Sequence, residues 1–492
     1  MAITINLINP EVEIRENRLK SLLSYNGSAS DLNEKSNTGV LKCKEGSFNQ
    51  CGDCSAQRAF NQVAQIKDVA VVSHGPIGCA GDFANFNTEN RGRLESRGLK
   101  ATNIQALTTN LLEKDTVYGG IEKLKATLDE AYRRFNPKVI FVTTSCASGI
   151  IGDDVESALN DKEKELGIPV IGVYCEGFKS KIWTTGFDAS FHSVLRKIVK
   201  PPKKKQDDLI NVFNFAGTDV FTSLFAKIGL RPNYVIQLST VEQLEKLSEA
   251  VASTHVCQTL GTYPGKILEQ EYGVPEVKAP TPFGIQWTDV WLREIGRITN
   301  REEAVEELII TERERIKPQL EELRKNLKGK KIYVLAGASY VHNMISITND
   351  LGLEVIGATS FHHDQHFDNN DKRLNSLNNV IETHGDIKHY NVCNKQPHQI
   401  INILRYLKPD LLIVRHGNIA GLGTKLGIPT VMTGDANIGV GYDGVLETGE
   451  RLLQAIQTKN LIRNISKHAK FPYTKWWYEQ SPFYFQGGIV NE

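Results

Sequence analysis

The chain has 492 residues, 40% of them hydrophobic and 23% charged, and its 58 Lys and Arg against 57 Asp and Glu give a formal net charge of +1. This composition is typical of a globular protein, and the balanced charge argues against nucleic-acid binding, which needs an excess of Lys and Arg. No stretch approaches the roughly 18 consecutive apolar residues of a transmembrane helix. Glu11, Glu13 and Arg15 stand where a secretory signal would be apolar, so we expect a cytoplasmic protein that does not bind membranes.

Short apolar runs alternate with helical patterns along the chain. In the first region, runs rich in Val and Ile predict buried strands, and the spacing of apolar residues over 121–134 predicts a helix. These runs are 68–72, 138–142 and 170–173. The basic segment 201–205 then predicts a solvent-exposed linker.

Two further regions repeat the alternation, and a charged, amphipathic stretch over 302–327 predicts a long helix between them. The predicted strands are 209–213, 234–236 and 251–256, then 331–335, 354–356, 410–414 and 429–432. Nearly all-apolar strands alternating with helices predict an α/β protein made of three doubly wound, parallel-sheet (Rossmann-like) domains. The expected boundaries are an N-terminal extension 1–45, domain I 46–205, domain II 206–300, domain III 301–455 and a C-terminal aromatic extension 456–492.

Several of the eight cysteines follow predicted strands. Cys79 and Cys146 come after the first two predicted strands, and Cys257 comes after the strand at 251–256. Cys51 and Cys54 form a Cys-x-x-Cys pair upstream of the first strand. Ligands of doubly wound folds bind at the carboxyl ends of strands, and loop thiolates are the usual ligands of iron–sulfur clusters. The shared position therefore favours a cluster over isolated buried thiols, whereas we interpret Cys43, Cys175 and Cys393 as structural.

The alternatives for Cys51 and Cys54 are zinc binding and thiol redox chemistry. A zinc site needs a second pair or spaced histidines, and a thioredoxin-like pair opens a helix directly after a strand, but neither context is present. Residues 261–266 resemble a phosphate-binding loop without its final Ser or Thr, so we expect no nucleotide site. His362, His363 and His366 could bind a metal, although a hydrogen-bonding role is favoured.

Motifs spread along the chain resemble the α subunit of nitrogenase component 1. They are His-Gly-Pro-Ile-Gly-Cys at 74–79, Ser-Cys-Ala-Ser-Gly-Ile-Ile-Gly-Asp-Asp at 145–154, Cys-Glu-Gly-Phe at 175–178, Cys257 with Tyr-Gly-Val-Pro at 272–275, and Gly-Tyr-Asp-Gly at 441–444. They follow the family's order from about residue 40 to 455, and the two cysteine loops together are specific for it. The chain is identified as a member of this superfamily, which implies the nitrogenase component 1 fold.

The resemblance implies cofactors and partners. Cys51, Cys79 and Cys146 match α-side ligands of a P-cluster-like or [4Fe–4S] cluster at the α–β interface, with Cys54 as the alternative to Cys51. Cys257 matches the cysteine that binds one end of the active-site cofactor. The implied partners are a homologous β subunit in an α2β2 heterotetramer and a separate homodimeric, ATP-dependent iron protein, which agrees with the absence of a phosphate loop in this sequence.

The departures from the family concern the cofactor pocket. Residues 430–440 contain no histidine, although dinitrogen-reducing relatives bind the far end of the cofactor with one there. Trp183 and Phe187 stand where relatives have a glutamine and a histidine, Ser339 replaces an arginine, and the lysine near homocitrate falls on or beside Asn418. These changes make the pocket aromatic, which favours a small-molecule substrate with an apolar body. Trp183, Phe187 and His363 are the pocket candidates, and no catalytic residue is assigned.

We therefore expect the catalytic α subunit of an oxidoreductase similar to the methylthio-alkane reductases, which cleave small thioethers reductively into methanethiol and a hydrocarbon. This resemblance implies a nitrogenase-type iron–sulfur–carbide cofactor without molybdenum or homocitrate. Two alternatives stay open. One is a scaffold subunit that assembles the cofactor, since scaffold relatives also keep the boundary cysteines and lack the histidine. The other is an authentic nitrogenase α subunit with an unusual ligand set.

Overall fold

The computed structural model describes residues 3–41, 54–214, 217–393, 396–434 and 437–482. It divides into two compact units. Unit 1 comprises Met1–Arg18, Asp53–Val256 and Leu260–Glu276, and unit 2 comprises Leu19–Gly52, Cys257–Thr259 and Val277–Glu492. Parallel sheets with helices on their faces build both units, which confirms the predicted α/β class. The domain boundaries drawn from the sequence stay predictions.

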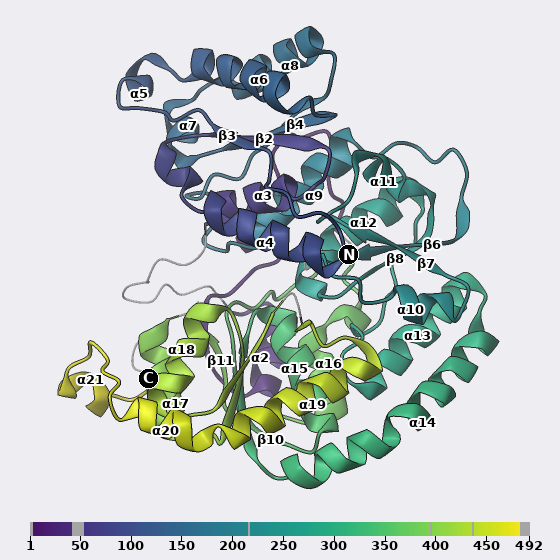
Figure 1. Ribbon diagram of the computed structural model, residues 1–492, viewed down its shortest axis with the longest axis vertical. Helices are drawn as coiled ribbons and strands as arrows, with labels where there is room; N and C mark the ends of the chain where they lie inside the picture. Colours follow the sequence, from purple (N-terminus) through teal and green to yellow (C-terminus); the bar gives the residue numbers. More distant parts are fainter. Residues whose placement is uncertain (1–2, 42–53, 215–216, 394–395, 435–436, 483–492) are drawn as a thin grey trace. The chain divides into compact units, whose positions relative to one another are not determined.

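The first sheet of unit 1 is parallel throughout and has the order β3-β2-β4-β5. Its strands are β2 (Val69–His74), β3 (Ala106–Thr108), β4 (Val139–Thr144) and β5 (Val170–Val173). Helices α6 (Ile121–Phe135) and α8 (Val155–Leu166) cover one face, and α3 (Ser55–Ala64) and α9 (Thr185–Lys197) cover the other (Figure 1). Alternate residues of β2 serve the two faces: Val71 packs in the α3–α9 core and Val72 in the α6–α8 core, as a pleated strand requires.

A second parallel sheet of unit 1 has the order β7-β6-β8. Its strands are β6 (Gln206–Phe213), β7 (Arg231–Val235) and β8 (Ala250–His255). The other helices named in this unit are α1 (Arg15–Arg18), α4 (Phe83–Ser96), α5 (Asp115–Tyr118), α7 (Cys146–Ile151), α10 (Thr222–Ala226), α11 (Val241–Glu245) and most of α12 (Gln258–Tyr272). The chain enters unit 2 at Cys257 and returns to unit 1 at Leu260, within the first turn of α12.

Unit 2 is built on a sheet of order β1-β11-β10-β9-β12-β13. Its strands are β1 (Ser24–Gly27), β9 (Lys331–Ala336), β10 (Glu354–Ser360), β11 (Tyr390–Cys393), β12 (Leu411–Arg415) and β13 (Thr430–Thr433). Only β1 pairs antiparallel among these strands. The helices are α2 (Ala29–Thr38), α13 (Ile285–Thr299), α14 (Glu302–Leu327), α15 (Ala338–Asp350), α16 (Ser376–His384), α17 (Pro397–Leu407), α18 (Gly417–Leu426), α19 (Gly441–Gln457), α20 (Lys459–Ser466) and α21 (Lys475–Glu479).

The predicted elements agree with the structure where their patterns are long and regular. The long amphipathic helix is α14, with the predicted bounds. Helix α11 ends at Glu245, because β8 begins at Ala250 and a short turn must lead into it. Strands β1, β3 and β11 were not predicted. They are three or four residues long and lie in polar sequence, so pairing with neighbouring strands decides their conformation rather than a local pattern.

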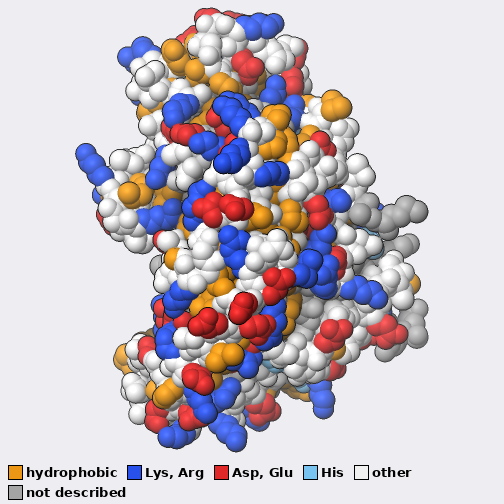
Figure 2. Space-filling model, turned by 90° about the vertical axis from the view of Figure 1, so that its right-hand side faces the viewer, with side chains coloured by type: hydrophobic (Ala, Val, Ile, Leu, Met, Phe, Trp, Pro, Cys, Tyr) orange, Lys and Arg blue, Asp and Glu red, His pale blue; other side chains and the backbone are white. Residues whose placement is uncertain are grey.

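The surface agrees with the balanced composition. Figure 2 shows Lys and Arg side chains interspersed with Asp and Glu over the face that it draws, without one sign of charge covering it. Within the described ranges, no helix combines the length and apolarity that crossing a bilayer needs.

Candidate functional site

Cys79 lies in a short 3₁₀ turn, Ile77–Ala80, just beyond the buried strand β2. The last residue of β2, His74, is buried, and its Nε2 lies 3.0 Å from Asp153 Oδ2. Asp153 also accepts a hydrogen bond from the Gly120 amide at 2.9 Å. Burial lowers the pKa of His74 although Asp153 opposes this, so the ring is neutral near pH 7 and donates to the carboxylate. This pair fixes the end of the strand from which the cysteine loop departs.

Cys146 is the first residue of α7, directly after β4. Ser145 caps the helix: its hydroxyl accepts from the Ser148 amide, and the Ser148 hydroxyl accepts from the Ser145 amide. The loop after β2 lies against this cap, since a Cβ at Gly75 would be 2.6 Å from Ser145 Oγ. A glycine is therefore required where the two cysteine loops meet.

The thiols of Cys54, Cys79 and Cys146 gather in unit 1. A Cβ at Gly177 would lie 2.7 Å from Cys54 Sγ and 3.4 Å from Cys146 Sγ, so both sulfurs approach the same glycine. Burial raises the pKa of Cys79, and the sulfurs of Cys54 and Cys146 raise it further. Of the predicted upstream pair, the structure describes Cys54, the N-cap residue of α3, whereas Cys51 lies outside the described residues.

This donor set fits a thiolate-bound iron–sulfur cluster. Three neighbouring thiols resist ionising together, and a bound cationic group removes that cost by accepting their charge. In the described part of the chain, no group of His, Cys, Asp and Glu is arranged to hold a single metal ion.

Cys175 and Cys393 are buried thiols. Burial raises the pKa of each to about 12, so both stay protonated. Cys393 donates a hydrogen bond to Gln399 Oε1 at 2.8 Å. Cys43, the third cysteine interpreted as structural, lies outside the described residues.

Cys257 immediately precedes α12, and its side chain belongs to unit 2. Its sulfur lies 2.9 Å from the Ser339 hydroxyl near the start of α15, and the residue is 6% exposed. The following residue is also held in unit 2, since the Thr281 hydroxyl lies 3.2 Å from Gln258 Oε1. One buried thiol beside one hydroxyl fits attachment of a metal group through a single sulfur, which the hydroxyl can orient by hydrogen bonding.

Trp183 and Phe187 lie together at the start of α9. Their ring centroids are 5.6 Å apart with an edge-to-face geometry, and Phe187 is buried. A residue that the sequence analysis missed joins them: the Arg58 guanidinium carbon lies 4.9 Å from the Trp183 ring centroid and 5.7 Å from that of Phe187. The only local signal for Arg58 is its position one helical turn after Cys54, which does not indicate the partner rings.

His363 lies in a buried polar cluster of unit 2. Its Nε2 is 2.8 Å from the Ser36 hydroxyl, and burial lowers its pKa to about 4, so the ring is neutral. Burial, together with a smaller effect of the charge interaction with His363, lowers the pKa of His342 to about 3. The ring of His362 lies 3.8 Å from Asp364. The Ser36 contact of His363 is a hydrogen bond, whereas 3.8 Å between His362 and Asp364 is too long for one, so the hydrogen-bonding role of the whole histidine group stays a prediction.

The stretch without histidine begins with β13, and Asp435 and Ala436 within it lie outside the described residues, as does the side chain of Asn418. The side-chain amide nitrogen of Asn437 donates a hydrogen bond to the Met432 carbonyl oxygen at 3.2 Å.

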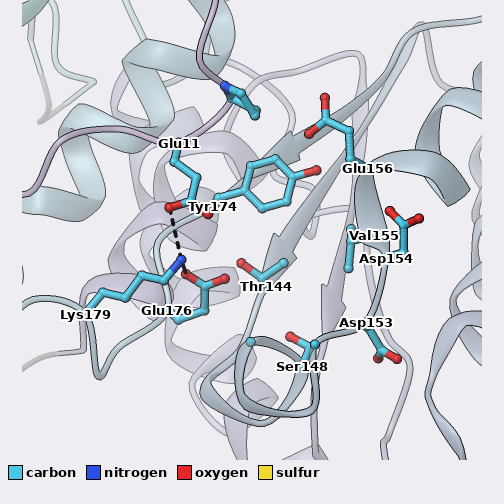
Figure 3. Close-up of a pocket in the computed structure, with 13 residues that line it drawn as sticks. Glu11, Thr144, Ser148, Asp153, Asp154, Val155, Glu156, Tyr174, Glu176 and Lys179 are labelled. Atoms are coloured by element: carbon cyan, nitrogen blue, oxygen red, sulfur yellow. Dashed lines mark hydrogen bonds and ion pairs between the residues drawn. The ribbon is translucent and has the colours of Figure 1, made fainter.

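An acidic cavity of about 250 Å³ lies beside α7 in unit 1 (Figure 3). Lys179 stands between two carboxylates there, 2.8 Å from Glu176 Oε2 and 3.2 Å from Glu11 Oε2. Glu176 also packs closely on α7, since a Cβ at Gly149 would lie 2.8 Å from its Cγ. The cavity was not predicted, because Glu11 and Lys179 meet across 168 residues of sequence.

The fold and the site define an α/β protein with parallel sheets whose thiols gather at strand ends. The chain belongs to the nitrogenase component 1 type oxidoreductase family, whose model matches residues 53–457. This confirms the family resemblance found in the motifs, while the likeness to methylthio-alkane reductases stays a proposal. Because the family match includes Cys54, Cys79, Cys146 and Cys257, every described candidate cysteine lies within it.

Similar proteins include both enzymes and assembly proteins by name. The chain is 32% identical over 307 residues to the nitrogenase molybdenum-iron protein alpha chain of Methanosarcina barkeri, covering 60% of this chain and 56% of that one. It is 31% identical over 335 residues to the nitrogenase iron-molybdenum cofactor biosynthesis protein NifE of Clostridium pasteurianum, covering 65% and 71%. A solved structure of nitrogenase Cp1 at pH 6.5 superposes with a TM-score of 0.69 at 21% identity, over 88% of this chain and 94% of that one, and supports the nitrogenase component 1 fold.

Proposed function

We propose that the chain is the catalytic α subunit of a cytoplasmic nitrogenase-like reductase that cleaves carbon–sulfur bonds of small methylthio-alkanes. The observation that carries this proposal is the edge-to-face contact of Trp183 with Phe187 at positions that the resemblance assigns to a glutamine and a histidine beside the cofactor. Aromatic rings there favour an apolar substrate and remove an imidazole suited to proton delivery.

Two sets of cysteines would hold the redox groups. Cys79 and Cys146, with Cys54 or Cys51, would bind the boundary cluster shared with a homologous β subunit, and the proximity of the three described thiols supports this. Cys257 would bind an iron–sulfur–carbide cofactor without molybdenum or homocitrate. A separate ATP-dependent iron protein would supply low-potential electrons, and these groups, when bound, would pass them to the substrate.

The chain's own residues would shape the reaction. Ser339 would orient the Cys257 sulfur through their 2.9 Å contact, and its hydroxyl carries no charge where the resemblance expects an arginine. Trp183 and Phe187 would bind the apolar body of the thioether and exclude water. His74 and Asp153 would hold the loop that carries Cys79, a positioning role that their 3.0 Å contact supports.

Turnover of ethyl methyl sulfide tests the proposal. The anaerobic complex with its iron protein and ATP is expected to release methanethiol and ethane in equal amounts, since one thioether, two electrons and two protons give one of each. Cys257→Ala is expected to lower the rate at least a hundredfold. Reduction of acetylene and formation of labelled ammonia from dinitrogen, without thioether turnover, would instead identify an authentic nitrogenase.

The similarity to NifE favours a second candidate function, that of a scaffold subunit that assembles the cofactor. A scaffold would transfer its cofactor to an apo-nitrogenase and turn over no thioether. Iron, sulfide and molybdenum analysis of the isolated complex adds a direct measure: two large iron clusters per αβ pair support the enzyme, and a small boundary cluster alone supports a scaffold that has released its product.

A further inference from the structure

Arg58 places a permanent positive charge against the two aromatic pocket candidates. Its guanidinium carbon lies 4.9 Å from the Trp183 ring centroid and 5.7 Å from the Phe187 ring centroid, within the range of a cation–π interaction. A guanidinium stays protonated at every physiological pH. A permanent positive charge therefore lies beside the two rings.

Helix packing fixes this arrangement. The Arg58 amide donates to the Cys54 carbonyl at 3.0 Å, which sets Arg58 one turn into α3. A Cβ at Gly186 would lie 2.3 Å from the Ser55 carbonyl oxygen and 2.8 Å from the Ala59 amide nitrogen, so α9 touches the α3 backbone between Trp183 and Phe187. Ser190 adds a hydrogen bond from its hydroxyl to the Ala59 carbonyl at 3.1 Å. The packed helices α3 and α9 hold the charge over Phe187 and over Trp183, which lies in the turn just before α9.

We propose that Arg58 is the specificity-determining residue of the carbon–sulfur reductase, selecting methylthio compounds whose far end is anionic and rejecting cationic ones. This inference rests on the proposed function, which places Trp183 and Phe187 against the substrate. Because aromatic walls screen charge poorly, the guanidinium interacts strongly with a charged group on a substrate held by the rings. Methylthio carboxylates are then the preferred substrate class.

The same charge suits the chemistry of the proposed reaction. In CH₃–S–R + 2 e⁻ + 2 H⁺ → CH₃SH + R–H, the C–S bond breaks, C–H and S–H bonds form, and the iron protein supplies both electrons. Negative charge develops on sulfur as the bond breaks, before a proton from solvent reaches it. Where the rings hold the reacting sulfur, the Arg58 guanidinium would stabilise that charge without having to move.

A substrate series on the complete complex tests the inference. 3-(Methylthio)propionate, methyl propyl sulfide and 2-(methylthio)ethylamine carry an anionic, a neutral and a cationic end on bodies of similar size. We measure kcat/KM for each with the iron protein and ATP, and the affinity of each for the resting complex by titration calorimetry. The ratio of anionic to cationic substrate is expected to fall roughly tenfold or more in Arg58→Gln, in both measurements.

Matched variants separate charge from structure. Arg58→Lys keeps the charge and is expected to retain most of the selectivity, whereas Arg91→Gln, which removes an exposed arginine of α4, is expected to leave it unchanged. Iron content, the melting temperature and hydrogen evolution from protons report folding and electron delivery, and all three are expected to match the wild type in Arg58→Lys.

The outcomes distinguish this inference from the proposed function. If the wild type turns over thioethers and Arg58→Gln shows the same ratio of anionic to cationic substrate, the role of Arg58 is overturned and the proposed reductase activity is supported. If the wild type turns over no thioether, the proposed reductase activity is overturned. The ratio of the calorimetric affinities for the anionic and the cationic compound, compared between wild type and Arg58→Gln, then tests the charge selectivity by itself. If the wild type neither binds nor turns over any of the three compounds, both are overturned.

Discussion

Gly177 shows how a single residue without a side chain lets two of the candidate cysteines approach the same point. The sulfurs of Cys54 and Cys146 approach it from α3 and α7, and a Cβ there would overlap Cys54 Sγ at 2.7 Å. Cys175, two residues before it, has a raised pKa because it is buried away from solvent. Neighbouring cysteines thus differ in their surroundings because of where the backbone places their sulfur atoms.

Gly177→Ala is therefore expected to disturb the boundary cluster. The added methyl group forces the Cys54 sulfur to move, and overpacking of this kind costs about 1–3 kcal/mol. We expect a lower iron content and an altered electron paramagnetic resonance spectrum of the reduced complex. Gly92→Ala, a position on α4 where a Cβ meets nothing within 4 Å, is the control and should change neither. A normal spectrum and iron content in Gly177→Ala would contradict the site.

At the scale of elements, α9 connects the Trp183–Phe187 pair to the N-terminal segment. Phe187 faces Arg58, while the next residue, Asp188, is fully buried and accepts from Arg15 at 2.8 Å and from Arg18 at 2.5 Å. Arg18 also lies over the Tyr263 ring at 4.7 Å. One carboxylate on α9 thus holds both arginines of α1, so the position of α9 depends on a segment far away in sequence.

Asp188→Asn is expected to destabilise the protein. Removing the charge that both buried guanidiniums contact leaves them poorly compensated, and breaking such buried pairs costs about 3–5 kcal/mol. The melting temperature of the isolated chain measures the loss. Glu130→Gln, which removes a carboxylate that contacts Arg133 and Arg134 on the surface, is the matched control and should produce no measurable change. Equal melting temperatures for the two variants would contradict the structural role of α1.

At the scale of the whole molecule, stability depends on burying neutral imidazoles. Burial lowers the pKa of His363 to about 4 in the folded chain, against about 6.5 in an unfolded one. Between these values the unfolded state binds more protons, so the contribution of His363 is complete above pH 6.5 and is lost as pH falls toward 4. Asp350 acts in the opposite direction, because burial raises its pKa to about 6.

His363→Gln is expected to flatten the acid side of the stability profile. The melting temperature of the wild type should fall more steeply between pH 6.5 and pH 4.5 than that of the variant, because one protonation site that distinguishes the folded and unfolded states is removed. Comparing the two profiles cancels the contribution of Asp350. His468→Gln, at an exposed position, should follow the wild-type profile. Parallel profiles for His363→Gln and the wild type would contradict a neutral, buried His363.

The sequence determined the α/β class, most strands of the three sheets and the family, because apolar periodicity and short glycine–cysteine motifs are local properties of the chain. It placed Cys79 and Cys146 at strand ends, and parallel strands bring such ends together. Tertiary structure alone decided that Cys54 joins them at Gly177, that Ser339 contacts Cys257 and that Arg58 covers Trp183 and Phe187. These contacts join residues from separate elements, and only the packing of helices on sheets sets such distances.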